Sequence, residues 1–293
     1  MQGPQAHLLP DGRRLHLNHG PIDLIIEGFG QLGEVQAAYR QAVARFQTLL
    51  DELVAELPEL RRPAALDRPR PFLSTIARRM ELAVAPLAHV FLTPMAAVAG
   101  SVADEILACM TAGRNLDKAY VNNGGDCAFH LAEGQKLNLA VTVDDNGLSD
   151  RIEIVWQSRV RGVATSGWRG RSFSLGIADA VTVLASSANR ADAAATVIAN
   201  AVDLPGHAAI ARRPAAELAP DNDLGERLVT VGVGTLTSEE IGTALAAGVR
   251  AADRLVVQGH IDRAFLWLGG QARTSISART FASPDIAVFA EQQ

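Results

Sequence analysis

A run of strand patterns from Ala119 to Gly167, with no helical pattern between them, restricts the fold of this chain more than any other feature. Four short apolar segments follow one another there and are separated by glycine or Asp-Asn-Gly turns: AYVNN, CAFHLA, KLNLAVTV and RIEIVW. Such turns join antiparallel neighbours, whereas parallel strands need a long crossover connection. We therefore predict an antiparallel meander flanked by helices, which is an α+β fold.

Helical periodicity surrounds this run of strands. From Glu34 to Pro58, apolar residues recur every three or four positions, which predicts a long amphipathic helix with one buried face. Two short strands with a turn at Asn18 to Pro21 should precede it. The other expected elements are helices at 73–85, 94–111, 188–201 (with Asn189 as N-cap) and 237–258 (with a capping box), strands at 178–184, 228–234 and 263–269, an extended link at 61–71 and a loop at 203–226.

Composition favours a single domain. A chain of 293 residues with 48% hydrophobic content can bury a substantial core, so we predict one unit over 1–293 with two closely packed lobes and a ligand cleft between them. A net charge of −5 and a pI near 5.8 argue against a nucleic-acid partner. The two cysteines, Cys109 and Cys127, are too few for a disulfide framework, and we expect both to be buried as small apolar residues.

Targeting signals are not apparent in the sequence. The first twenty residues contain neither the apolar stretch nor the small-residue cleavage site of a signal peptide. No run of 18 uncharged apolar residues occurs. We therefore expect a cytoplasmic protein without a membrane partner.

Gly28, Gly30 and Gly33 form a GxGxxG pattern between a strand and a helix. In a Rossmann unit these glycines let a pyrophosphate approach the helix N-terminus. The unit should then return to a second parallel strand, but here the helix runs into the proline-rich and arginine-rich segment 58–71. We interpret the pattern as a plain strand-to-helix turn.

The segment VNNGGD at 121–126 is a candidate ligand contact. Gly124 and Gly125 allow close approach to the backbone, and Asn122, Asn123 and Asp126 can hydrogen-bond ring edges or ribose hydroxyls. The alternative is a simple hairpin turn, which Asn-Gly favours.

The segment GVATSG at 162–167 is a second candidate. Thr165 and Ser166 offer hydroxyls for a phosphate or a metal-bound water, with Gly167 at a strand end and Trp168 placed to stack on a ring. No GxSxG elbow is present, which argues against a serine hydrolase. A turn stabilised by the hydroxyls, without function, is the alternative.

Asp192 and Thr196 in ADAAAT lie four residues apart on a predicted helix and therefore share one face. A carboxylate and a hydroxyl can bind one hard divalent cation, while the small alanines between them let a bulky ligand approach. The alternative is that Asp192 only stabilises the first turn of its helix.

The order and spacing of these signatures resemble the ApbE-like proteins, most closely their small cytosolic uncharacterised relatives. The signatures concentrate in 93–200 and read TPMAAVAGSVAD (93–104), VNNGGD (121–126), GVATSG (162–167) and ADAVTVLASSANRADAAAT (178–196). Well-known ApbE proteins use FAD and a divalent metal to attach FMN to a threonine of a target protein. The resemblance implies FAD or FMN beside the GGD and ATSG segments. It also implies Mg²⁺ at Asp192, Thr196 and a backbone carbonyl of Ala97 to Gly100, assigned to Val98.

One segment departs from the ApbE pattern. Where transferases carry a histidine in a motif like HxxDPxTG, this chain has Arg171-Ser-Phe-Ser-Leu-Gly176, and Arg171 could pair with a phosphate. No catalytic residue is therefore assigned. We expect a protein that binds a flavin nucleotide and a divalent metal. The alternatives are a flavin-dependent reductase of a small heteroaromatic ring, an FMN transferase with a protein acceptor, and a binding protein without catalysis. A homo-oligomer is compatible with each.

Overall fold

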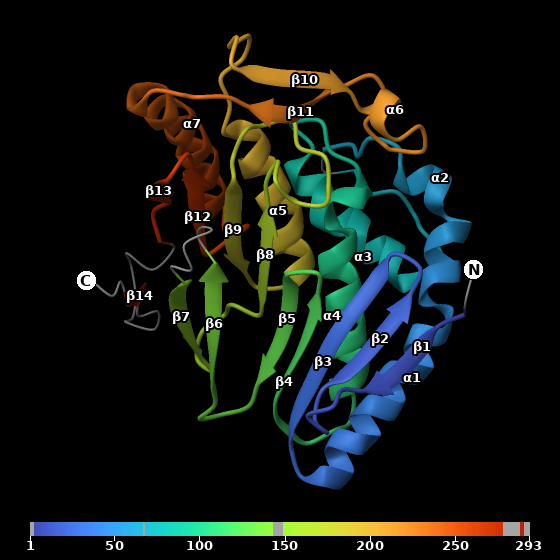
Figure 1. Cartoon of the computed structure of the whole chain (residues 1–293). Helices are drawn as coiled ribbons and strands as arrows, with labels where there is room; N and C mark the ends of the chain where they lie inside the picture. The colour runs from blue at the N-terminus through green and yellow to red at the C-terminus, as the bar shows by residue number, and fades with distance from the viewer. Residues whose placement is uncertain (1–2, 67, 143–148, 278–287, 290–293) are drawn as a thin grey trace.

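The computed structural model describes residues 3–66, 68–142, 149–277 and 288–289. The described part centres on a nine-stranded sheet in the order β1-β2-β3-β4-β5-β8-β9-β12-β13, and all its neighbouring strands are antiparallel (Figure 1). Its strands are β1 Gln5–Leu8, β2 Leu15–His19, β3 Ile22–Gly30, β4 Leu116–Asn123, β5 Asp126–Leu131, β8 Gly162–Ser166, β9 Ala180–Ala185, β12 Arg263–Leu268 and β13 Gln271–Thr274. The α+β class with a large antiparallel sheet flanked by helices is confirmed. The two-lobed arrangement stays a prediction.

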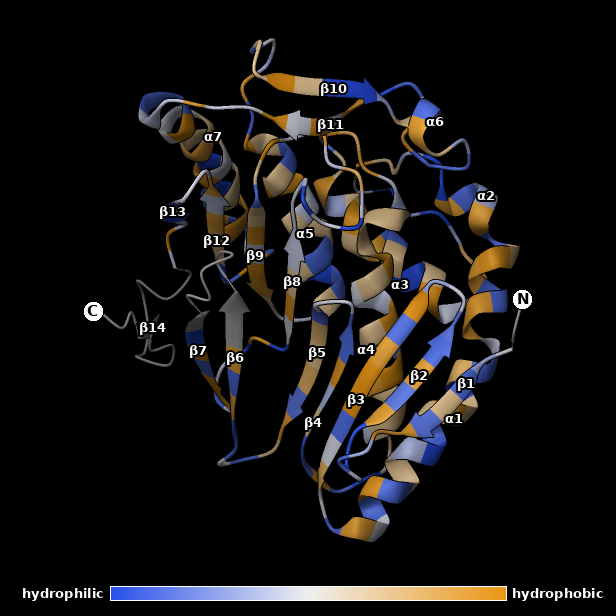
Figure 2. Ribbon diagram, in the orientation of Figure 1, coloured by the Kyte–Doolittle hydropathy of each residue, from blue (hydrophilic) through white to orange (hydrophobic). Residues whose placement is uncertain are grey.

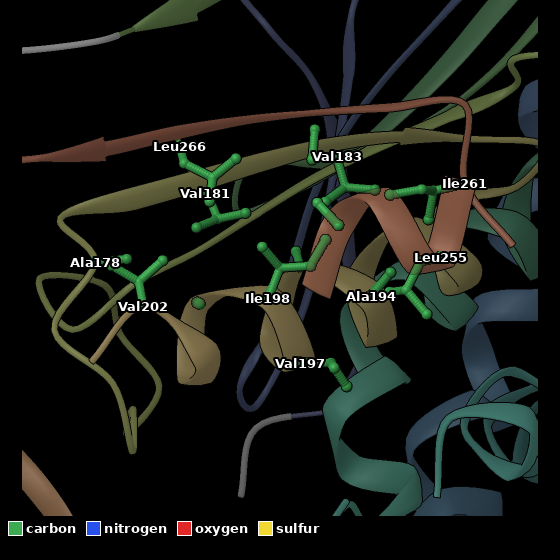
Figure 3. Packing of buried hydrophobic residues seen from close by; sticks show 14 of the residues in the cluster. Ala178, Val181, Val183, Ala194, Val197, Ile198, Val202, Leu255, Ile261 and Leu266 are labelled. Atoms are coloured by element: carbon green, nitrogen blue, oxygen red, sulfur yellow. The ribbon is translucent and has the colours of Figure 1, made fainter. Parts of the chain in front are cut away.

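The longer helices cover one face of this sheet. The helices are α1 Leu32–Ala55, α2 Leu57–Leu60, α3 Thr75–Val84, α4 Val98–Thr111, α5 Ala188–Ala201, α6 Ala215–Leu218 and α7 Ser238–Val257, with the 3-10 turns η1 Ala85–Leu87 and η2 Pro94–Ala97. One core cluster joins α5 and α7 to β9 and β12 (Figure 3), and a second joins α1, α3 and α4 to β2, β3 and β4. Strand β9 is hydrophobic over most of its length (Figure 2), because both of its faces are covered.

The predicted meander is only partly correct. Strands β6 Lys136–Thr142 and β7 Ser149–Val155 leave the main sheet and form a second small sheet with β14 Val288–Phe289, so β5 pairs directly with β8. Ile152 and Ile154 of β7 pack with Phe129, Val163 and Trp267 of the main sheet. The β6–β7 hairpin therefore covers apolar side chains on the face of the main sheet that is opposite the helices. The expected Asp-Asn-Gly turn at 145–147 lies outside the described residues.

Several element boundaries differ from the predictions. The expected loop at 203–226 contains β10 Ile210–Pro214, which pairs with β11 Leu228–Val233, and α6. The arginines and proline of β10 hide its strand character, as is common on an edge strand. The helix expected at 94–111 begins as η2 and continues as α4. Strands β1 and β13 were not predicted.

Other predictions are confirmed. Gly28 and Gly30 lie in β3 and Gly33 lies in α1, and β3 is antiparallel to both of its neighbours, so GxGxxG is a strand-to-helix turn. Thr237 and Glu240 form the expected capping box at the start of α7. Cys127 is buried as expected, whereas Cys109 is only half-buried. In the described part of the chain, no helix is long and apolar enough to cross a bilayer.

Candidate functional site

The NNGGD segment forms the tight turn between β4 and β5. Gly124 (φ 64°) and Gly125 (φ 115°) both adopt backbone angles that other residues rarely take. Asn122 Oδ1 accepts the Gly125 N–H at 2.8 Å, and Asn123 Nδ2 donates to the Ala99 carbonyl at 3.1 Å. The turn is therefore fixed from within, and Asn123 ties it to the start of α4.

Neighbouring residues of the signatures point to opposite faces of the sheet. In β4, Asn123 is buried towards α4, while Asn122 lines a cavity on the hairpin side. In β8, Thr165 bonds Thr182 on the hairpin side, and Ala164 lies in the helix-side core, which puts Ser166 on that helix side too. The two residues of each pair are adjacent in the sequence, but strand alternation places them on opposite faces of the sheet.

Helix α5 begins at a carboxylate from α4. The Ala188 and Asn189 N–H groups donate to the two oxygens of Asp104 at 3.0 and 2.8 Å. Ser187 is the N-cap, so the prediction of Asn189 was wrong; the Asn189 side chain instead accepts from Ser187 and donates to the Arg79 carbonyl. Burial raises the pKa of Asp104 to about 6, against the lowering effect of the two N–H groups.

Helices α4 and α5 approach very closely here. A Cβ on Gly100 of α4 would lie 2.3 Å from the Ala188 carbonyl oxygen of α5. Strand β8 is equally close to α5, since a Cβ on Gly162 would lie 2.1 Å from the Ala188 nitrogen. Only glycine fits at both positions. Asp104 was not predicted as a site residue, although it ends the TPMAAVAGSVAD signature.

Asp192 lies on the first turns of α5, facing this junction. Its Oδ2 accepts the Gly100 N–H at 2.9 Å. Burial raises the pKa of Asp192 well above its usual value, and the nearby Asp126 and Asp104 carboxylates raise it further, while the Gly100 and Ala99 N–H groups lower it. A buried carboxylate beside other carboxylates favours either a bound proton or a bound cation.

The other two predicted metal-binding residues lie nearby. Thr196 is half-buried one turn further along α5, with buried alanines at 193–195 between it and Asp192. Val98 is the first residue of α4, where the chain leaves η2. In the described ranges, no group of three or more His, Cys, Asp and Glu residues is arranged to hold a metal ion. The role of these residues as metal ligands stays a prediction.

Asp126 begins β5 and is buried. Its Oδ1 accepts the Thr165 N–H at 3.1 Å, so the GGD and ATSG segments are joined directly. Burial raises the pKa of Asp126 to about 7, and the positive charge of Arg171 lowers it. The carboxyl group therefore changes charge near neutral pH.

Arg171 occupies the space that a side chain at position 124 would need. A Cβ on Gly124 would lie 1.5 Å from the guanidinium. A cavity of about 340 Å³, named here the arginine cavity, is lined by His16, Asp23, Ile25, Asn122, Gly124, Gly125 and Arg171. Within the described part of the chain, no carboxylate lies within ion-pair distance of Arg171. Its charge is therefore available to an anion.

A second cavity, of about 510 Å³, lies on the hairpin side and is named here the hairpin cavity. It is lined by Tyr120, Asn122, Gly125, Cys127, Leu137, Asn138, Leu139, Val163, Thr165 and Thr182. The lining combines apolar side chains with amide and hydroxyl groups, as in many small-molecule sites. Asn122 and Gly125 line both cavities, so the two adjoin at the β4–β5 turn.

Trp168 and Gly167 lie at the end of β8, outside the linings of both cavities. Trp168 Nε1 donates to Asp179 Oδ1 at 3.2 Å, and the Arg169 guanidinium lies 4.8 Å from the ring centroid. A Cβ on Gly167 would lie 2.4 Å from the Asp179 carbonyl oxygen. Stacking of Trp168 on a ligand ring stays a prediction.

The sequence matches the family described as AbpE bacteria over residues 6–274. A UPF0280 protein of Methanopyrus kandleri is 37% identical over 161 residues, which cover 55% of this chain and 63% of that protein. A UPF0280 protein of Methanothermobacter thermautotrophicus is 39% identical over 114 residues, which cover 38% of this chain and 43% of that protein. The chain thus spans less than two thirds of the length of these relatives.

Solved structures with a similar arrangement include two transferases. The flavinyl transferase ApbE of Pseudomonas stutzeri, in its apo form, shares 14% identity at a TM-score of 0.44, covering 96% of this chain and 97% of that chain. The flavin transferase ApbE of Vibrio cholerae shares 12% identity at a TM-score of 0.43, covering 95% of this chain and 100% of that chain. Values this low transfer no function.

Proposed function

Since the chain belongs to the AbpE bacteria family, in agreement with the ApbE-like order of its motifs, we propose that it binds a flavin nucleotide together with a divalent cation. The observation that carries the proposal is the half-buried Asp192 side chain, which accepts the Gly100 N–H at the junction of α4 and α5 and lies near enough to Asp126 for the two charges to interact. A cation would neutralise charge at such a site, because it removes the repulsion between the two carboxylates.

The residues present fit Mg²⁺. Asp192, Thr196 and a backbone carbonyl near Val98 are all hard oxygen donors, which Mg²⁺ prefers. They are too few to complete a coordination shell by themselves. Mg²⁺ commonly completes its shell with water and with the phosphates of a bound nucleotide. The small donor set therefore supports a cation that binds with a nucleotide rather than alone.

The two adjoining cavities fit the parts of a flavin nucleotide. Phosphate oxygens suit the arginine cavity, where the Arg171 guanidinium offers donors and the glycines at 124 and 125 let a ligand approach the backbone. A flat ring suits the hairpin cavity, where Asn122 and the Thr165–Thr182 hydroxyl pair can bond its polar edge.

This chain's residues would bind and orient the ligand. Arg171 neutralises phosphate charge, and Asp126, with a pKa of about 7, can hold or release a proton near the turn. The cation, when bound, supplies Lewis-acid polarisation of a phosphate oxygen.

FAD and FMN are the proposed flavins. Reduction of a small heteroaromatic ring by bound flavin is the alternative that keeps the same ligand, and a binding protein without catalysis is the other.

Binding can be measured directly. FAD, FMN and ADP are titrated into the protein by calorimetry, with Mg²⁺ and with EDTA. We expect micromolar binding, with FAD preferred and with weaker binding in EDTA. If all three ligands fail to bind at millimolar concentration, the proposed function is wrong.

A further inference from the structure

We propose a second ligand site, for a molecule with an apolar body and a carboxylate head, at the opposite end of α5 from Asp192. A cavity of about 820 Å³, named here the helix-end cavity, lies there between the ends of α5 and α7 and the segment around Phe91. Small-molecule sites generally occupy about 300–1,000 Å³ and are mostly apolar with a few polar groups. This cavity has that size and that kind of lining.

The floor of the helix-end cavity is made by one stripe on each of two helices. Val197 and Ala201 are four residues apart on α5, and Ala251 and Leu255 are four apart on α7, so each pair shares a helix face. Figure 3 shows Val197 and Leu255 on the two helices. The helices touch where a Cβ on Gly248 would lie 2.3 Å from the Val202 side chain. Beyond that contact, the short side chains of the two alanines leave space.

The walls of the cavity are held by hydrogen bonds within the protein. Arg212 donates to the Leu175 carbonyl and to the Asp203 carboxylate, and Leu175 N–H donates to Asn200 Oδ1 at 2.9 Å. Leu175, Asn200 and Asp203 all line the cavity. A site whose walls are already fixed loses little conformational entropy when a ligand binds.

The charges around the cavity favour an anion. Asp203, the acidic residue of the lining, is already paired with Arg212. Arg254 lines the cavity from α7, and within the described part of the chain no carboxylate lies within ion-pair distance of it. His89 and His260 also lie at the lining.

The end of α7 does not oppose an anion strongly. The carbonyls of Arg254, Leu255 and Val256 accept the N–H groups of Gln258, His260 and Gly259, respectively. Arg254 lies three residues after Ala251 and four before Gln258, so the donors of Arg254 and Gln258 lie beside the apolar floor. A guanidinium can bind a carboxylate through two parallel hydrogen bonds. With the apolar floor beside Arg254, the cavity thus suits an apolar or aromatic carboxylic acid.

The test uses naphthalene carboxylate and its neutral carboxamide, titrated into the full chain by calorimetry. We expect the carboxylate to bind more tightly than the amide. Arg254→Gln should weaken binding of the carboxylate by about tenfold or more, as expected when a charged hydrogen-bond partner is lost. Binding of the amide should be unchanged. Arg250→Gln is the matched control, because Arg250 lies on the same helix outside the lining. Ala251→Trp should fill the cavity and abolish binding of both probes.

Three results would overturn the proposal: no carboxylate binding at millimolar concentration, equal effects of Arg254→Gln and Arg250→Gln, or undiminished binding to a folded Ala251→Trp protein. If Ala251→Trp does not fold, the comparison of the two arginine variants decides. Asp192→Asn should leave the binding of naphthalene carboxylate unchanged. Failure of flavin binding and failure of this site are therefore separate outcomes.

Discussion

At the scale of single residues, Asp192 is the side chain on which the proposed function depends most. Asp192→Asn keeps an oxygen that can accept the Gly100 N–H but removes the charge. We expect Mg²⁺-dependent nucleotide binding to weaken by roughly 1–3 kcal/mol, the range for losing a charged partner. Binding in EDTA should change little.

Asp51→Asn, on the exposed side of α1, serves as the control for this change. Thermal unfolding of the Asp192→Asn protein should show a folded chain. Unchanged Mg²⁺-dependent binding would mean that Asp192 only stabilises the start of α5.

Gly124 is the second residue whose role can be isolated. An alanine there would have to displace the Arg171 guanidinium from the arginine cavity, in addition to the strain of φ 64°. Gly134 has a similar φ of 79° and open space around it, so Gly134→Ala carries the backbone strain alone. We expect both variants to lose about 1–2 kcal/mol of stability. Only Gly124→Ala should also weaken nucleotide binding by calorimetry, and equal binding by the two variants would contradict this.

At the scale of elements, the start of α5 depends on a carboxylate from α4 instead of on its own N-cap. Asp104 has a pKa of about 6 in the folded protein, above its ordinary 3.8. Between these two values the folded chain holds the proton more firmly than the unfolded chain, so this group favours folding at low pH and the advantage is lost as pH rises to about 6. Asp104→Asn should therefore reduce the fall in stability between pH 4 and 6.

Denaturant unfolding at several pH values checks this prediction, with Asp51→Asn as the control. Asp126 also has a raised pKa, so part of the pH dependence should remain in the Asp104→Asn protein. An unchanged slope would show that the carboxyl group of Asp104 does not titrate differently in the folded state.

At the scale of the whole molecule, we expect no FMN transfer to a threonine at the rate of an ApbE transferase. Removing a proton from a threonine hydroxyl needs a positioned base as well as a metal-polarised pyrophosphate. The segment 171–176 offers an arginine and serines where the transferase motif has a histidine. Incubation with FAD, Mg²⁺ and an acceptor domain, followed by mass spectrometry of the acceptor, measures the transfer. Efficient addition of FMN would make the transferase the leading function.

Local patterns in the sequence were sufficient for much of the fold. The three-to-four residue period of α1, the Thr237 capping box and the Asn-Gly turn at 123–124 are decided by residues close together in the chain, so they could be predicted. The four-residue spacing of Asp192 and Thr196 likewise placed both on one helix face.

The tertiary structure alone decided which of these pieces meet. Asp104 caps α5, β6 and β7 lie outside the main sheet, and Arg171 lies over Gly124. Each of these features depends on residues that are far apart in sequence. Strand alternation then separated Thr165 from Ser166, although they are adjacent in the chain. A sequence pattern records local conformation, whereas these contacts depend on how buried faces are covered and on how closely glycines let elements approach.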